Sequence, residues 1–63
     1  MDYIYVLIAG YDSWEDIIIY LTEEKAIEAS KIFPNWRVEI FIRRDYDFVP
    51  VYRYYKNGTL FSP

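Results

Sequence analysis

Residues 36–44, WRVEIFIRR, alternate apolar and polar side chains more regularly than any other part of the chain. The even-numbered positions from Trp36 to Ile42 are all large and apolar. The odd-numbered positions from Arg37 to Arg43 are charged, with the exception of Phe41. Because successive side chains of a strand point to opposite faces, this pattern predicts a strand with one buried face.

Two more strands are expected on the C-terminal side of this stretch. Residues 44–48 predict a turn and residues 49–56 a strand, in which Pro50 has no backbone donor and marks an edge or a bulge. Asn57-Gly58 then predicts a type I′ hairpin turn, because both residues accept a positive φ. Residues 59–61 can return as a short last strand.

One amphipathic helix is expected on the N-terminal side, from Thr22 to about Phe33. The Thr22 hydroxyl can cap the first turn, and Glu23 and Glu24 suit the positive end of the helix dipole. Pro34 disfavours helical geometry in the residue before it and so ends the helix. Small and apolar residues lie on one side of the helix, whereas charged residues lie on the other.

The N-terminal third of the chain predicts a hairpin of two strands. Residues 2–9 are apolar on both faces, which is typical of a central strand. Residues 14–21 predict a second strand around three consecutive isoleucines, Ile17 to Ile19. Because only residues 10–13 separate the two strands, they are expected to pair antiparallel.

The expected element order is therefore ββαββ, with a fifth strand at the C-terminal end. One helix covers one face of an antiparallel sheet, so the sequence predicts a two-layer α+β fold with a mainly antiparallel sheet of four or five strands. The chain of 63 residues is too short for two domains, and residues 1–63 are expected to form a single domain.

The composition removes most routes to catalysis. The chain has no Cys and no His, which excludes a disulfide, a thiolate nucleophile, a histidine base and a Cys/His zinc site. Two glycines cannot build a glycine-rich phosphate loop. We therefore expect a protein that is not an enzyme and needs neither a metal nor another cofactor.

Two groups of carboxylates could still be interpreted as a hard-metal or acid–base site. Asp12, Glu15 and Asp16 form the first group, and Asp45 and Asp47 form the second. Our interpretation is simpler, because Asp residues at these positions commonly stabilise turns through side-chain hydrogen bonds.

Aromatic residues make up 22% of the chain, more than one helix and one sheet of this size can enclose. The uncovered face of the sheet is expected to carry some of six aromatic residues: Tyr3, Tyr5, Tyr20, Phe41, Tyr52 and Tyr54. Soluble monomers rarely expose a large apolar patch. We therefore expect self-association, most simply as a homodimer, through an aromatic sheet face or a sheet edge.

Two alternative functions stay open at this stage. Basic and aromatic residues are interleaved in the C-terminal half, as in proteins that bind single-stranded nucleic acid, although the net charge of −3 opposes phosphate binding. The basic candidates are Arg37, Arg43, Arg44, Arg53 and Lys56. A small-ligand pocket lined by Trp14, Trp36 and tyrosines is the other alternative.

Three segments resemble small uncharacterised ββαββ proteins of large DNA viruses and phages: residues 5–9, the helix start at residues 22–26 and the strand at residues 36–41. The resemblance implies the same fold and a viral protein that acts on host or virion proteins. It carries over no functional residues.

An intracellular location is expected, in the host cytoplasm or nucleus, or in the virion if the protein is viral. Asp2 precedes the apolar run at residues 3–9, which therefore lacks the basic start of a secretory signal. That run is also too short to span a bilayer, so no membrane association is expected.

Overall fold

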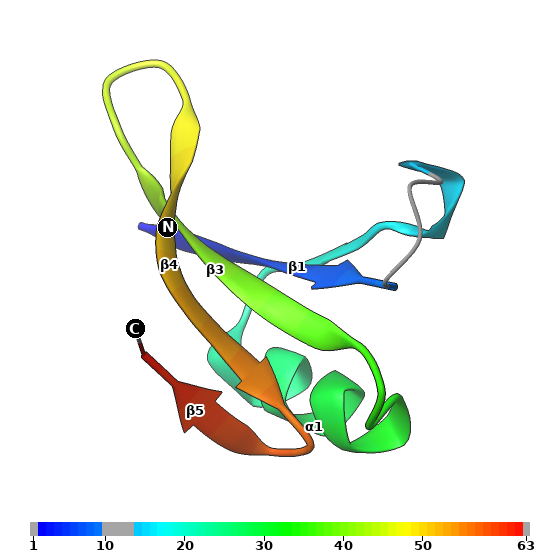
Figure 1. Ribbon diagram of the computed structural model, residues 1–63. Coiled ribbons are helices and arrows are strands. Elements are labelled where there is room, and N and C mark those ends of the chain that lie inside the picture. The colour runs from blue at the N-terminus through cyan, green and yellow to red at the C-terminus, as the bar shows by residue number, and fades with distance from the viewer. Residues whose placement is uncertain (1, 10–13, 63) are drawn as a thin grey trace.

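The computed structural model describes residues 2–9 and 14–62, which form one helix layer on a five-stranded antiparallel sheet (Figure 1). The predicted α+β order ββαββ with a fifth strand is confirmed. In chain order the elements are β1 (Tyr3–Ile8), the 3₁₀ turn η1 (Trp14–Asp16), β2 (Ile18–Tyr20), α1 (Glu23–Ile32), β3 (Arg37–Arg43), β4 (Phe48–Lys56) and β5 (Thr59–Phe61).

The strands lie in the order β2-β1-β3-β4-β5, and each neighbouring pair is antiparallel. β1 lies inside the sheet, as its two apolar faces predict. β2 and β3 therefore run parallel to each other on either side of β1, and α1 connects them across the sheet. The two outer strands, β2 and β5, have three residues each.

The second strand is shorter than the sequence predicts. Residues 14–16 form η1, in which the Ile17 backbone N–H donates to the Trp14 carbonyl at 3.2 Å, and pairing with β1 covers only Ile18 to Tyr20. The physical reason is that strand-favouring β-branched residues begin only at Ile17.

Hydrogen bonds from Thr22 and Ser30 anchor α1. The Lys25 backbone N–H donates to the Thr22 hydroxyl at 3.3 Å, which confirms the predicted N-cap. The buried Ser30 hydroxyl donates to the Ile27 carbonyl at 2.7 Å and accepts from the Gly58 N–H at 2.9 Å. Ser30 therefore ties the turn between β4 and β5 to the helix.

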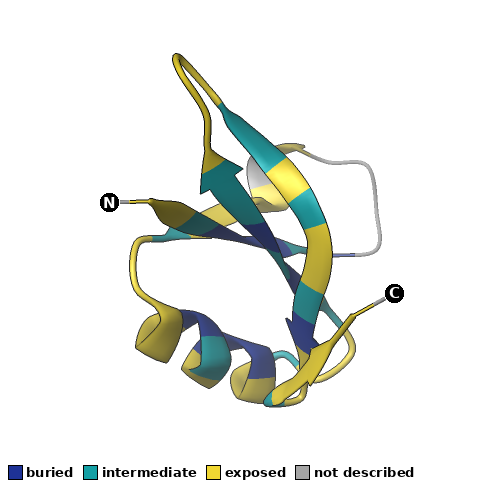
Figure 2. Cartoon of the chain, turned by 90° about the vertical axis from the view of Figure 1, so that its left-hand side faces the viewer, coloured by how far each residue is buried: buried dark blue, intermediate teal, exposed yellow. Residues whose placement is uncertain are grey.

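The core lies between α1 and the sheet, where Figure 2 shows the buried side of the helix facing the strands. The register brings side chains from different strands into rows. One row on the helix face crosses all five strands, with its two ends exposed and Leu7 and Val38 fully buried. From edge to edge this row contains Ile18, Leu7, Val38, Tyr55 and Leu60.

A bulge interrupts the pairing of β3 with β4. Glu39 lies opposite Tyr54 and Phe41 lies opposite Pro50, so three residues of β4 face the single residue Ile40. Pro50 borders this bulge, as the missing backbone donor predicts. Within it, Tyr52 has a φ of 64°, which is rare for a bulky side chain. Beyond the bulge the β3–β4 hairpin extends away from α1 (Figures 1 and 2).

The turn between β4 and β5 matches its sequence signal. Asn57 and Gly58 have φ values of 51° and 81°, the positive pair that a type I′ turn requires. The short last strand, Thr59–Phe61, forms as an outer strand against β4.

Candidate functional site

Five exposed large apolar side chains lie on β2 and its flanks. We call this surface the β2 edge and define it by Trp14, Ile17, Ile18, Ile19 and Leu21. Each of these side chains is at least 43% exposed, and Trp14 reaches 77%. Ile18 lies on the helix face and Ile19 on the opposite, open face, so the exposed apolar surface wraps around the strand.

The position of β2 explains this exposure. β2 pairs with β1 on one side, and no described strand pairs with its other side. α1 packs mainly on β1, β3 and β4, so it leaves the helix face of β2 partly open. Natural edge strands are usually protected by charged side chains, proline or a bulge. Residues 17–21 of this chain contain neither a charged residue nor proline.

The open face carries two of the six aromatic residues proposed from the sequence, Phe41 and Tyr54. One row of side chains crosses it, and the only aromatic members are Tyr54 and Phe61, which stack with ring centroids 5.3 Å apart. The Arg37 guanidinium lies 5.4 Å from the Tyr54 ring centroid and pairs with Glu39 at 2.8 Å. From β2 to β5 this row contains Ile19, Val6, Glu39, Tyr54 and Phe61.

The six predicted interface aromatics are therefore split between two faces. Tyr5 and Tyr20 point toward the helix, and Tyr3 lies on the same face at 38% exposure. Phe41 and Tyr54 lie on the open face, where both are half-buried.

Tyr52, the sixth of these residues, lies in the bulge at 69% exposure. No single surface unites the six. The run of three isoleucines, Ile17 to Ile19, was a stronger signal for an exposed apolar surface than the six aromatic residues. It lies at a strand that has one partner among the described strands.

The five predicted nucleic-acid residues are also dispersed. Arg37 is paired with Glu39, and Arg44 is held in the β3–β4 turn by Asp47, with Nε to Oδ1 at 2.8 Å. These bonds hold the pKa of Asp47 below its usual value.

The other three basic residues are exposed and lie apart from one another. Arg43 is at the end of β3 and Lys56 is at the end of β4. Arg53 lines a cavity on the helix side of the sheet. The five residues do not form one continuous basic surface.

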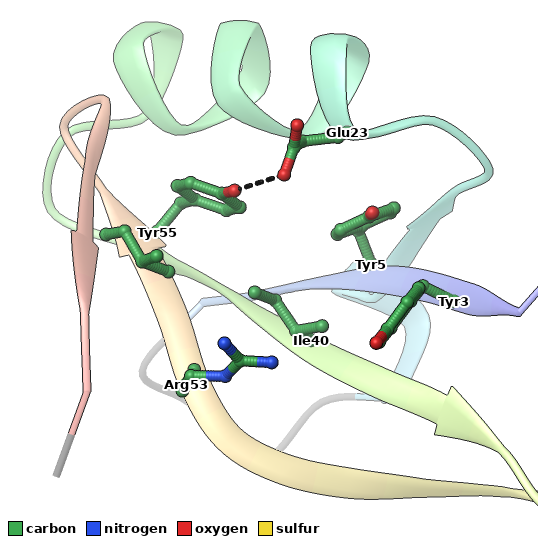
Figure 3. Close-up of a pocket in the computed structure, with 7 residues that line it drawn as sticks. Tyr3, Tyr5, Glu23, Ile40, Arg53 and Tyr55 are labelled. Carbon is green, nitrogen blue, oxygen red and sulfur yellow. Dashed lines mark hydrogen bonds between the residues drawn. The ribbon is translucent and has the colours of Figure 1, made fainter.

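That cavity has a volume of about 220 Å³ and lies between the start of α1 and the sheet (Figure 3). Residues from α1 and from every strand except β2 line it: Tyr3, Tyr5, Glu23, Ile40, Arg53, Tyr55 and Leu60. The Tyr55 hydroxyl donates to the Glu23 carboxylate at 2.7 Å. Below we call this hollow the tyrosine cavity.

Two tyrosines of this cavity stay protonated well above neutral pH. Burial and, second, the hydrogen bond to Glu23 raise the pKa of Tyr55 to about 12. Burial and then the charge of Glu23 also raise the pKa of Tyr5 above its ordinary value of 10.0. Both hydroxyls therefore remain hydrogen-bond donors.

The pocket expected from the sequence was lined by Trp14, Trp36 and tyrosines. Neither tryptophan lines the tyrosine cavity. Trp14 is 77% exposed on the β2 edge, and Trp36 stacks on Phe33 with ring centroids 4.9 Å apart. Trp36 thus packs at the end of α1, where its partner Phe33 caps the helix.

The carboxylate groups of the sequence do not converge in the part of the chain that is described. Asp47 pairs with Arg44 in a turn, in line with its turn interpretation, whereas Asp12 and the side chain of Glu15 lie outside what the structure describes. Among the side chains that the structure describes, no group of three or more acidic residues could hold a metal ion. Over the same residues, no helix has the length and apolar character needed to cross a membrane.

Comparisons with known proteins identify no relative of this chain. No protein-family model, curated protein or solved structure matches this chain. The candidate surfaces, the β2 edge and the tyrosine cavity, therefore have to be interpreted from their own geometry.

Proposed function

We propose that this chain is a non-enzymatic interaction protein that forms a homodimer by antiparallel pairing of its β2 edges. The observation that carries the proposal is an outer strand that has only one partner among the described strands and exposes apolar side chains on both faces of the sheet. Such a strand offers free backbone donors and acceptors together with apolar surface. Of the two interfaces expected from the sequence, an aromatic sheet face or a sheet edge, the proposal therefore selects a sheet edge, the isoleucine-rich β2 edge.

A second copy of the same chain can pair with this strand, so no other protein is needed to cover it. A twofold axis perpendicular to the sheet sets two identical strands antiparallel and keeps both α1 helices on the same side. Pairing all three residues of β2 requires the axis to pass at Ile19, so that Ile19 faces its own copy and Ile18 faces Tyr20. The two five-stranded sheets then become one continuous sheet.

The same register avoids repulsion between charges. Ile17 lies opposite Leu21, and Asp16 lies opposite Thr22, so no like charges face each other from residue 16 to residue 22. Apolar side chains that are roughly half exposed in one copy, such as Ile18 and Ile19, become covered by the other. Burial and backbone pairing therefore favour the same arrangement.

The mass in solution tests the proposal. Light scattering and sedimentation from about 10 µM to about 1 mM cover the affinities expected of a small edge interface. A dimer has twice the 7.7 kDa mass of one chain. A monomer over the whole range would refute the proposal.

The proposal includes an intracellular setting and action on host or virion proteins. The absence of Cys and the resemblance to small viral proteins support these points. Under the proposal, the dimer presents two identical open faces to such a protein.

Nucleic-acid binding is the second candidate, and one group of residues favours it. Tyr54 and Phe61 stack on the open face beside Arg37, and Lys56 lies on the same face by register. Stacking aromatics beside basic groups suit single-stranded nucleic acid. Labelled single-stranded and duplex DNA should be titrated at two salt concentrations. Weakening by Tyr54→Leu but not by Tyr46→Leu would support this candidate, and absence of salt-sensitive binding would exclude it.

A further inference from the structure

The tyrosine cavity is separate from the surface that the proposed dimer buries. No residue of β2 lines it, and its walls come from β1, α1, β3, β4 and β5. Pairing of two β2 edges would therefore leave the cavity open, so it can have a function of its own.

Its walls have the composition of a small-molecule site. Tyr5 and Tyr55, which are 8% and 6% exposed, stand on two sides of the hollow, and Ile40 lies between them (Figure 3). Aromatic walls with a few placed polar groups are typical of ligand pockets. Such a slot suits a flat, apolar ring.

The two charged residues of the cavity lie on opposite sides of it. Glu23 belongs to the first turn of α1, whereas Arg53 belongs to β4 at the far side of the hollow (Figure 3). Within residues 2–9 and 14–62, no carboxylate forms an ion pair with Arg53. The cavity therefore presents an acceptor at one end and a cation at the other.

One more polar group faces the interior of the hollow. Tyr5 is buried, but its hydroxyl has no hydrogen-bond partner among the described residues. Tyr5 is one of the residues that line the cavity, and no described buried side-chain oxygen is left without a partner. A ligand placed there meets a hydroxyl that can donate or accept.

We propose that the tyrosine cavity binds a small planar zwitterion, with a ring between Tyr5 and Tyr55, a cationic group at Glu23 and an anionic group at Arg53. A molecule with only one charge would leave one of the two protein charges without an opposite charge beside it. The volume of about 220 Å³ equals about seven water molecules, which fits one ring with two short substituents.

A matched set of single-ring compounds tests the proposal. The probes are 4-(aminomethyl)benzoate, which carries both charges, benzylamine, benzoate and benzyl alcohol, titrated separately into ¹⁵N-labelled protein. We expect the zwitterion to shift the amides of the lining residues and to bind at least about fivefold tighter than either singly charged probe. Equal binding of all four probes, or no shifts at the lining residues, would overturn the proposal.

Two variants assign the two ends. Arg53→Gln should reduce binding of the zwitterion to the level of benzylamine, and Glu23→Gln should reduce it to the level of benzoate, while the glutamine still accepts from Tyr55. Arg43→Gln and Glu24→Gln change exposed charges outside the cavity and serve as matched controls. Equal losses in variants and controls would mean that the position of the removed charge does not matter, and would contradict the site.

Discussion

Replacing Ile19 with lysine should dissociate the proposed dimer, because Ile19 faces its own copy across the twofold axis. The side chain is 55% exposed in the single chain, so the dimer covers about half of it. Full burial of an isoleucine contributes about 2 kcal/mol, so the two copies lose about 2 kcal/mol together. Two facing ammonium groups about 4 Å apart and surrounded by water add about 1 kcal/mol of repulsion. A total of about 3 kcal/mol raises the dimer Kd more than 100-fold.

Sedimentation of the wild type and of Ile19→Lys over the same concentrations measures this change. Ile32→Lys is the matched control, because Ile32 is 63% exposed at the end of α1 and lies outside the β2 edge. Thermal unfolding of both variants at low concentration shows whether the monomer is still folded. An unchanged Kd for a folded Ile19→Lys protein would refute edge pairing.

A mixture of two variants tests the twofold register itself. Ile19→Asp should also be monomeric, but an equimolar mixture of Ile19→Asp and Ile19→Lys should form a heterodimer, because opposite charges then face each other. This rescue is expected only if position 19 lies opposite itself. Two variants that each dimerise less and do not recover when mixed would place the axis elsewhere.

Three further predictions concern stability. Ser30→Ala should lower the free energy of unfolding by about 1–2 kcal/mol in denaturant titrations, because the Gly58 N–H loses its acceptor. The raised pKa of Tyr55, about 12, means that its protonated form stabilises the fold. This contribution is complete below pH 10 and is lost as the pH rises through about 12, so Tyr55→Phe should flatten the alkaline fall in melting temperature. Tyr52→Gly should be about 1 kcal/mol more stable than Tyr52→Ala in thermal melts, since only glycine adopts a φ of 64° freely.

Local sequence patterns predicted most of the fold. The alternation in residues 36–44, the Thr22 cap and the Asn57-Gly58 turn each depend on neighbours close in the chain, and all three are confirmed. The predicted start of the second strand was wrong, since β2 begins at Ile18 rather than at Trp14. There Trp14 resembled the start of a strand, although Glu15 and Asp16 separate it from the isoleucines.

The candidate site was harder to predict, because it depends on register. β1 is apolar on both faces, so its sequence could not tell whether Tyr5 or Val6 points toward the helix. Only pairing with Ile40 sets Tyr5 on the core side. The tyrosine cavity also joins Glu23 to Arg53, which lie thirty positions apart in the chain. No local pattern connects such residues.

The bulge in β4 has a consequence for insertions and deletions in this chain. Three residues of β4 oppose one residue of β3, so β4 carries two extra residues at the bulge. Because side chains alternate between the two faces, an even number of extra residues leaves the side chains on both sides of the bulge on the faces they would have without it. Removing two residues at Tyr52 would remove the bulge and keep Val49 beside Ile42 on the helix side. Removing one would turn Val49 to the open face. Natural length variants of this protein should therefore differ here in steps of two.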